Sequence, residues 1–166
     1  MLIPPTDQLK SSFASIADNE TEILILGTLP GEKSLEMQQY YANPRNRFWR
    51  IVAEVTGSDL PNTYPEKLEM LRQNKIGVWD VVHTARRIGS LDTNILDEVP
   101  NDLEQFISTH PQLKLIAFNG AKAQKLFDKY FRRKEHLKYL PLPGTSPANA
   151  SFSLERLYER WREILL

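Results

Sequence analysis

The sequence lacks cysteine altogether, and its 166 residues carry no net charge because 21 basic side chains balance 21 acidic ones. Without cysteine the chain forms no disulfide, no thiolate zinc site and no cysteine nucleophile, and such a composition fits a reducing compartment. A net charge of zero argues against a general nucleic-acid binder that relies on bulk positive charge. The three histidines are not spaced as a metal triad, so we expect neither a metal ion nor another cofactor.

Long apolar runs are also missing, since none approaches the roughly 20 residues that span a membrane. Residues 1–5 (MLIPP) are too short for the apolar core of a secretory signal. We therefore expect a cytoplasmic protein without membrane association. The length, with 41% apolar and 25% charged residues, is typical of one globular domain, predicted to span residues 1–166.

Charge is unevenly distributed along the chain. Residues 120–140 contain seven Lys and Arg side chains and two acidic ones. This local excess predicts either one basic side of the molecule or an ordinary solvated helix face. Both interpretations stay open at the level of sequence.

Short apolar runs alternate with helical patterns along the chain. The predicted strands are residues 22–26, 76–82, 113–118 and 137–142, and the predicted helices lie near 48–55, 65–74, 102–110, 121–131 and 153–165. Strands that alternate with helices form right-handed crossovers, so we predict an α/β fold of three layers, α/β/α, around a central four-stranded parallel sheet. Ligands of such folds bind beyond the carboxyl ends of the strands, where the Gly- and Pro-rich segments of this chain converge.

The segment LILGTLPGEKS at residues 24–34 runs from the first predicted strand into a loop. Residues 27–34 lack the Gly-Lys-Ser/Thr order of a P-loop and the spacing of a dinucleotide fingerprint. The loop is either an ordinary strand-to-helix turn or a pocket lined by backbone N–H groups, which hold an anionic or carbonyl-bearing group.

This loop, followed by YYANPRNRFW at residues 40–49, resembles the first motif region of the uracil-DNA glycosylase superfamily. The similarity is greatest to the hypoxanthine-DNA glycosylase branch, with features of the mismatch-specific uracil/thymine branch. Further blocks of the family pattern follow in order: GVWDV at 77–81, GSLD at 89–92, FNG at 118–120 and LPGTSPAN at 142–149. The resemblance covers roughly residues 20–165. It implies a glycosylase-like domain that excises deaminated bases, hypoxanthine or uracil, from DNA in base excision repair.

The resemblance assigns the orientation of the attacking water to Asn46, with Asn43 as the nearby alternative. Leu29 stands where the mismatch-specific branch has its water-activating asparagine, and an aliphatic side chain cannot do that work. An amide is no general base at neutral pH, but it orients a water and stabilises charge in an oxocarbenium-like transition state. Asn46 alternatively caps the helix that follows.

A base taken out of the DNA stack needs an aromatic face and polar partners. Tyr41 aligns with the base-stacking aromatic residue of related glycosylases, and core packing is its alternative role. The amide of Asn119 suits the O6/N1–H or O4/N3–H edge of hypoxanthine or uracil, although Asn119 is also a natural turn residue. We expect backbone groups of the first loop to complete the base site, from Gly27, Leu29, Pro30 and Gly31.

The superfamily's second motif falls in the loop after the last strand, where this chain has no leading histidine. We therefore do not expect very rapid uracil excision. Small hydroxyls and backbone N–H groups in that loop suit phosphate contacts, and a plain polar turn is the alternative. The predicted DNA-contacting residues are Ser34, Arg47, Gly144, Thr145, Ser146 and Asn149.

Asp80 ends the second predicted strand at the same edge, and we expect a structural carboxylate that caps a loop rather than a general base. No matched motif supplies an activated lysine, so we expect a monofunctional enzyme without Schiff-base chemistry. The predicted partner is DNA that contains deaminated bases, bound by a monomer. A non-catalytic module that binds damaged bases or nucleobases is the alternative function, whereas a metal-dependent nucleotide hydrolase would need a ligand set that the sequence does not offer.

Overall fold

The computed structural model describes residues 9–165. Its strands are β1 (Leu9–Ser11), β2 (Ile23–Gly27), β3 (Ile76–Asp80), β4 (Val82–Arg86), β5 (Leu96–Pro100), β6 (Leu115–Asn119) and β7 (Lys138–Leu142). Its helices are α1 (Glu32–Met37), α2 (Phe48–Thr56), α3 (Tyr64–Gln73), α4 (Leu103–Thr109), α5 (Ala121–Tyr130) and α6 (Leu154–Trp161), with short 3₁₀ turns at Asp92–Asn94 and Arg162–Leu165.

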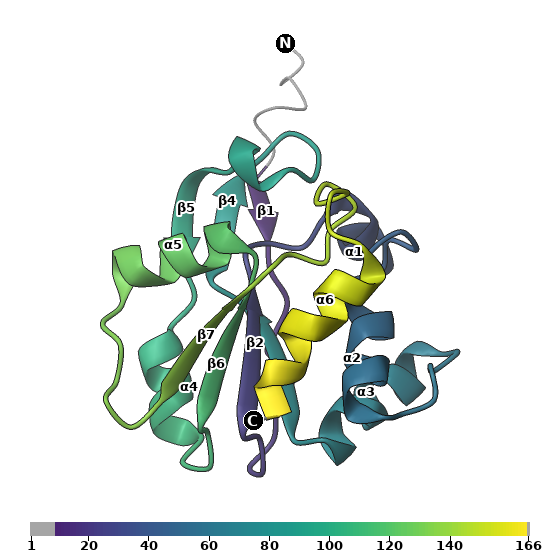
Figure 1. Cartoon of the computed structure of the whole chain (residues 1–166). Helices are drawn as coiled ribbons and strands as arrows, with labels where there is room; N and C mark the ends of the chain where they lie inside the picture. The colour runs from purple at the N-terminus through teal and green to yellow at the C-terminus, as the bar shows by residue number, and fades with distance from the viewer. Residues whose placement is uncertain (1–8, 166) are drawn as a thin grey trace.

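The central sheet contains four parallel strands in the order β3-β2-β6-β7. Side chains of β2 alternate between its two faces: Ile25 packs with α2, α3 and α6, whereas Leu24 and Leu26 pack with α4 and α5. Figure 1 shows the two helix groups on opposite sides of the sheet. Because both faces are covered, the strands read as continuous apolar runs. The predicted α/β fold of three layers is confirmed.

The prediction of one strand over residues 76–82 is wrong, because the chain turns after Asp80. The N–H of Val81 donates to the carbonyl of Gly27 at 2.9 Å, and Val82 then starts β4. Both valines are buried, so the apolar run continues through the turn and hides it. Strand β4 lies between β1 and β5 in a small antiparallel sheet that the sequence did not predict.

The helix ends follow the local sequence signals. Ser153 accepts a hydrogen bond from the N–H of Arg156 at 3.2 Å and starts α6, as a Ser cap should. Asp102 caps α4 through Gln105, and Gly57 ends α2 with a left-handed φ of 68°. These caps confirm the predicted helix starts and stops to within a few residues.

The predicted single domain stays a prediction, because residues 1–8 and 166 lie outside the described part of the chain. Within residues 9–165 the two apolar clusters lie on opposite faces of the same sheet. The carboxyl ends of β2, β3, β6 and β7 meet at one edge because all four strands run in the same direction. The loops that leave this edge build the site.

Candidate functional site

A cavity of about 920 Å³ opens at the carboxyl edge of the central sheet. It is formed by the loops after β2, β6 and β7, by the segment before α2 and by the connection from β4 to β5. Thirteen of the fourteen residues that the sequence proposed for the site line it: Gly27, Leu29, Pro30, Gly31, Ser34, Tyr41, Asn43, Asn46, Asn119, Gly144, Thr145, Ser146 and Asn149. The exception is Arg47.

Tyr41 presents an aromatic ring to this cavity from an unusual backbone conformation. Its φ of 53° lies in the left-handed region, which is costly for a bulky residue. One ring face stacks on Phe48, with ring centroids 3.9 Å apart and an interplanar angle of 19°. The ring is thus packed on one side and lines the cavity, so core packing and cavity lining coexist. Burial raises the pKa of the Tyr41 phenol, which stays protonated at neutral pH.

Asn119, at the end of β6, holds its amide in a fixed orientation. The backbone N–H of Thr145 donates to Oδ1 at 3.0 Å, which identifies that atom as the oxygen. The amide nitrogen donates to the hydroxyls of Tyr41, at 3.2 Å, and of Thr145, at 3.1 Å. Both N–H groups of Asn119 therefore already have protein partners. The amide cannot flip, but its donors are not directed at a ligand.

Asn43 and Asn46 belong to one turn before α2. The side chain of Asn43 accepts from the N–H of Arg45 at 2.9 Å, and its carbonyl accepts from the N–H of Asn46 at 2.9 Å. The side-chain oxygen of Asn46 accepts from the N–H of Phe48 at 2.9 Å. The N-cap position of α2 is Arg47, so Asn46 is not the cap residue itself, but its bond to the first residue of the helix holds its side chain in place beside the cavity.

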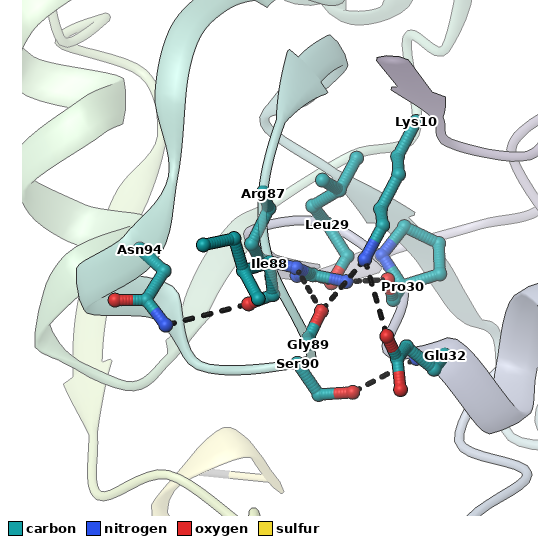
Figure 2. Close-up of polar contacts among 9 residues, drawn as sticks. All are labelled: Lys10, Leu29, Pro30, Glu32, Arg87, Ile88, Gly89, Ser90 and Asn94. Atoms are coloured by element: carbon teal, nitrogen blue, oxygen red, sulfur yellow. Dashed lines mark hydrogen bonds and ion pairs between the residues drawn. The ribbon is translucent and has the colours of Figure 1, made fainter. Parts of the chain in front are cut away.

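The loop after β2 offers its backbone to the cavity, because the Leu29 side chain is buried in the core. Arg87, which is 1% exposed, donates to the carbonyls of Leu29, at 3.3 Å, and of Pro30 (Figure 2). The N–H of a trans peptide points opposite to its carbonyl. The N–H of Gly31 is therefore directed away from Arg87.

A second set of polar contacts joins the same loop to residues 87–90 (Figure 2). Arg87 and the ammonium of Lys10 donate to the carbonyl of Gly89 at 2.9 and 2.8 Å. The ammonium of Lys10 also lies 3.7 Å from the carboxylate of Glu32. The backbone N–H of Glu32 donates to the Ser90 hydroxyl at 2.9 Å. These contacts fasten the start of α1 to the β4–β5 connection.

Arg47 holds the loop after β7 by a similar arrangement. Its guanidinium donates to the carbonyls of Phe152 and of Asn149, the latter at 3.0 Å. Its backbone N–H donates to the carbonyl of Thr145 at 3.1 Å. Arg47 thus shapes a wall of the cavity without lining it, and its contact with DNA stays a prediction. Ser34 is buried and accepts from the N–H of Ala42 at 3.1 Å, and its contact with DNA also stays a prediction.

Two residues with carboxyl groups, Asp80 and Asp92, line the cavity. Burial raises the pKa of Asp80 to about 8; the neighbouring Asp92 also raises it and Arg87 opposes both. Burial also raises the pKa of Asp92, against a hydrogen bond of 2.6 Å from the Thr28 hydroxyl. The expected loop cap at Asp80 is instead made by the Asn101 amide, which donates to the Asp80 backbone carbonyl at 2.8 Å.

Sequence reasoning missed the β4–β5 connection as part of the site, although GSLD at 89–92 matched a family block. Ser90, Leu91 and Asp92 all line the cavity. Leu91 is 52% exposed at the rim. Arg87 left no signal of its own, since an arginine in a charged segment is usually solvated.

The basic excess in residues 120–140 is partly neutralised by ion pairs. Lys129 lies 2.9 Å from Glu98, Lys134 lies 2.8 Å from Glu104, and Arg133 lies 3.0 Å from Asp128. This arrangement favours the solvated helix face over a wholly basic side.

Metal and membrane features can be stated for residues 9–165. No group of three His, Cys, Asp or Glu side chains in that range is arranged to hold a metal ion. No helix in the same range has the length and apolar character needed to cross a bilayer. A separate hollow of about 680 Å³ beside α6 is lined by none of the proposed site residues.

Residues 13–165 match the family model described as the uracil DNA glycosylase superfamily. Two curated proteins named hypoxanthine DNA glycosylase are similar to the chain. The one from Methanosarcina acetivorans is 41% identical over 94% of this chain and 98% of its own length. The one from Methanosarcina barkeri is 45% identical over 69% of this chain and 73% of its own length.

A solved structure shares the same fold. It is a solution NMR structure of a candidate uracil DNA glycosylase from Methanosarcina acetivorans, with a TM-score of 0.78 and 37% identity. The similarity covers 96% of this chain and all of the other chain. The fold and the sequence relatives therefore point to the same family.

Proposed function

We propose that this chain, which belongs to the uracil DNA glycosylase superfamily, is a monofunctional DNA glycosylase that removes hypoxanthine and, more slowly, uracil from DNA. The reaction is hydrolysis of the N-glycosidic bond. The bond between C1′ and the base nitrogen breaks, the base leaves with the electron pair, and the water oxygen bonds to C1′. One proton of the water ends on the base. The products are a free base and an abasic sugar, the starting point of base excision repair.

The observation that carries this proposal is that Tyr41 and Asn46, from the segment before α2, line the same cavity as Asn119, which ends β6 and lies more than 70 residues away in the sequence. An extruded base requires an aromatic surface and polar groups at its rim. In our proposal Tyr41 stacks on the base and Asn46, with its oxygen anchored at the N–H of Phe48, orients the attacking water. The names of the two curated relatives support hypoxanthine as the first substrate.

The proposal includes the remaining expected partners. The loop after β7 contacts the phosphates through Ser146, Asn149 and neighbouring N–H groups, since that loop lies at the same cavity. The protein acts as a monomer in the cytoplasm, without metal or cofactor. Light scattering in solution tests the monomer, and base release in excess EDTA tests the absence of a metal requirement.

Base release from duplexes that contain inosine, uracil or xanthine tests the proposed function. Under single-turnover conditions we expect release by the wild type, a loss of about 100-fold or more in Asn46→Ala, and a smaller loss in Asn43→Ala. Full activity of Asn46→Ala would contradict the assignment of the water-orienting residue. Binding of the duplexes without any abasic product would instead favour the damaged-base binding module.

Trapping with borohydride tests the monofunctional mechanism. Lys33 lines the cavity, and its exposed ammonium lies 3.8 Å from Glu36. Hydrolysis by water forms no Schiff base, so we expect base release without a trapped protein–DNA adduct and without strand cleavage. A borohydride-trapped complex that disappears in Lys33→Ala would contradict this mechanism.

A further inference from the structure

Asp80 carries a buried carboxyl group that the fold does not use. Asp80 is 4% exposed and lines the cavity. Its Oδ2 atom is buried and has no hydrogen-bond partner among residues 9–165. A buried polar atom without a partner costs about 1–3 kcal/mol, and such atoms call for an explanation in a native structure. The position of this carboxyl on the cavity wall suggests that its partner is a ligand.

The surroundings of Gly27 show where the carboxyl group lies. A Cβ atom placed on Gly27 would come within 2.8 Å of Oδ1 of Asp80 and within 3.1 Å of the hydroxyl of Tyr41. The carboxyl of Asp80 and the hydroxyl of Tyr41 therefore lie on either side of Gly27, and all three residues line the cavity. A base that stacks on the Tyr41 ring would therefore lie close to the carboxyl of Asp80.

Asn119 is less available for the base than its position suggests. Its two amide N–H groups donate to Tyr41 and Thr145, and its oxygen accepts from the N–H of Thr145. A base could gain a donor from this amide only if one of those bonds broke. Asp80 loses no hydrogen bond of Oδ2 when it binds a ligand.

We propose that Asp80, as a neutral carboxylic acid, binds the Watson–Crick edge of the extruded base, donating its O–H to the exocyclic oxygen and accepting the ring N–H on its other oxygen. This inference rests on the proposed glycosylase function and names the residue that recognises the base. Hypoxanthine offers O6 with N1–H, and uracil offers O4 with N3–H.

The groups around Asp80 favour its neutral form. Burial, with the charge of Asp92, raises the pKa of Asp80 to about 8, and Arg87 is the one opposing charge among the causes of this shift. Tyr40 and Tyr41 also face the carboxyl, and burial raises the pKa of both phenols, so neither supplies a charge at neutral pH. A carboxylic acid kept neutral in a dry site can donate a hydrogen bond at pH 7.

The donated hydrogen bond acts where charge develops. As the glycosidic bond breaks, the base takes the electron pair and negative charge spreads onto its exocyclic oxygen. A fixed donor at that oxygen strengthens as the charge grows and therefore stabilises the transition state more than the bound substrate. Asp80 keeps its proton throughout. An ionised Asp80 would lose the donor and repel the leaving base.

The same bond gives a specificity rule. Adenine and cytosine carry an amino group in place of the exocyclic oxygen, so the leaving charge gains no such stabilisation. Guanine shares O6 and N1–H with hypoxanthine, so its exclusion depends on contacts around its 2-amino group and not on Asp80. The inference thus predicts release of deaminated bases over adenine and cytosine.

The test is single-turnover base release from an inosine duplex between pH 6 and 9.5. Asp80→Ala removes both hydrogen bonds, and we expect a loss of about 100-fold or more at pH 7. Asp80→Asn restores a donor and an acceptor that do not titrate, and we expect it to recover most of that loss. The wild-type rate should fall about tenfold per pH unit above pH 8, where Asp80 ionises, whereas Asp80→Asn should not show this fall.

Both enzymes meet the same substrate, so Asp80→Asn also controls for titration of the base itself. Asp59→Asn makes the same chemical change at an exposed position and should leave rate and pH profile unchanged. Wild-type activity in Asp80→Ala, or an equal alkaline fall in Asp80→Asn, would overturn the inference. If Asp80→Ala does not fold, the Asp80→Asn profile decides alone. A wild type that releases no base at any pH would overturn the proposed function instead.

Discussion

Two loops border the cavity, and each is held by an arginine that donates to backbone carbonyls. Arg87 holds the loop after β2 through Leu29 and Pro30, and Arg47 holds the loop after β7 through Asn149 and Phe152. Arg87 is 1% exposed, whereas Arg47 is partly exposed. The same contact, from a guanidinium to backbone carbonyls, thus occurs once in a buried environment and once in a partly exposed one.

Because Arg87 is buried and Arg47 is partly exposed, we expect the two loops to respond differently when their arginine is lost. Burial lowers the pKa of Arg87, and the nearby Asp92 and Asp80 counter this effect. Removal of Arg87 leaves the carbonyls of Leu29, Pro30 and Gly89 without this donor in a buried setting, and it removes the positive charge near Asp80 and Asp92. The carbonyls held by Arg47 can exchange a lost donor for water. The loop after β2 therefore depends on its arginine, whereas water can take over part of the hydrogen bonds that hold the loop after β7.

The largest expected effect is that of Arg87→Met. Its removal uncouples the first loop from residues 87–89, and we expect a loss of about 3–5 kcal/mol in the free energy of unfolding together with loss of base release. Urea denaturation measures the first and single-turnover assays the second. Arg86→Met is the matched control, because the Arg86 side chain is half exposed and, among residues 9–165, its one ion pair is with Asp97 at 4.0 Å. Equal effects of the two substitutions would contradict the role of Arg87 in holding the loop after β2.

The acids beside the first loop should make stability depend on pH. The pKa of Asp80 is about 8 in the folded chain and near 4 in an unfolded one, so the folded state binds an extra proton between these values. The free energy of unfolding therefore falls as pH rises from about 4 to 8, by up to roughly 1.4 kcal/mol per unit. Denaturation of Asp80→Asn should lack this decline. A stability advantage of Asp80→Asn that does not grow with pH would refute the titration.

Substitution of one glycine on each side of the cavity, Gly27 at the end of β2 and Gly144 in the loop after β7, compares the two loops directly. Gly27→Ala places its Cβ 2.8 Å from Oδ1 of Asp80, so we expect base release to fall about 100-fold, with an overpacking cost of about 1–3 kcal/mol. Gly144→Ala meets only ordinary contacts, the nearest being Gly120 Cα at 3.6 Å, and should stay within tenfold of the wild-type rate. The comparison fails if Gly144→Ala is the more damaging change.

The smallest effect is expected for Arg47→Ala. Its partly exposed hydrogen bonds contribute about 1–2 kcal/mol to stability, and water replaces part of them. We expect weaker DNA binding through a loosened loop and a kcat that changes less than KM. Arg47→Lys keeps the charge without the forked geometry and should recover little of the DNA affinity. Recovery of full affinity by lysine would mean that Arg47 contacts phosphate as a simple charge.

Sequence alone predicted the central sheet well because its strands are short buried runs that end at clear turn residues. Leu24, Ile25 and Leu26 are fully buried in β2, as a strand covered on both faces requires. The run 76–82 misled because Val81 and Val82 stay buried while the chain changes sheets. An apolar run shows that its residues are buried but not which way the chain runs, so neither the turn after Asp80 nor the antiparallel sheet was predictable from it.

The candidate site was predictable as a set of residues but not as a set of contacts. Family motifs placed Asn46, Tyr41 and Asn119 in one region, and all three line the cavity. The bonds of Arg87 to the first loop join residues 58 and 57 positions apart, and that of Asn119 to Tyr41 spans 78. Such partners depend on tertiary packing, so no local pattern announces them. The roles of Asn46, Tyr41 and Asn119 in catalysis stay predictions.

The exposed position of Leu91 beside the cavity allows a fluorescent label there to report DNA binding. Because the sequence has no cysteine, a thiol introduced at this exposed position would be unique and would accept a single fluorophore. The dye would sit where a duplex must approach, outside the groups that we assign to base chemistry. Its emission would then follow arrival and departure of DNA in real time, separately from bond cleavage.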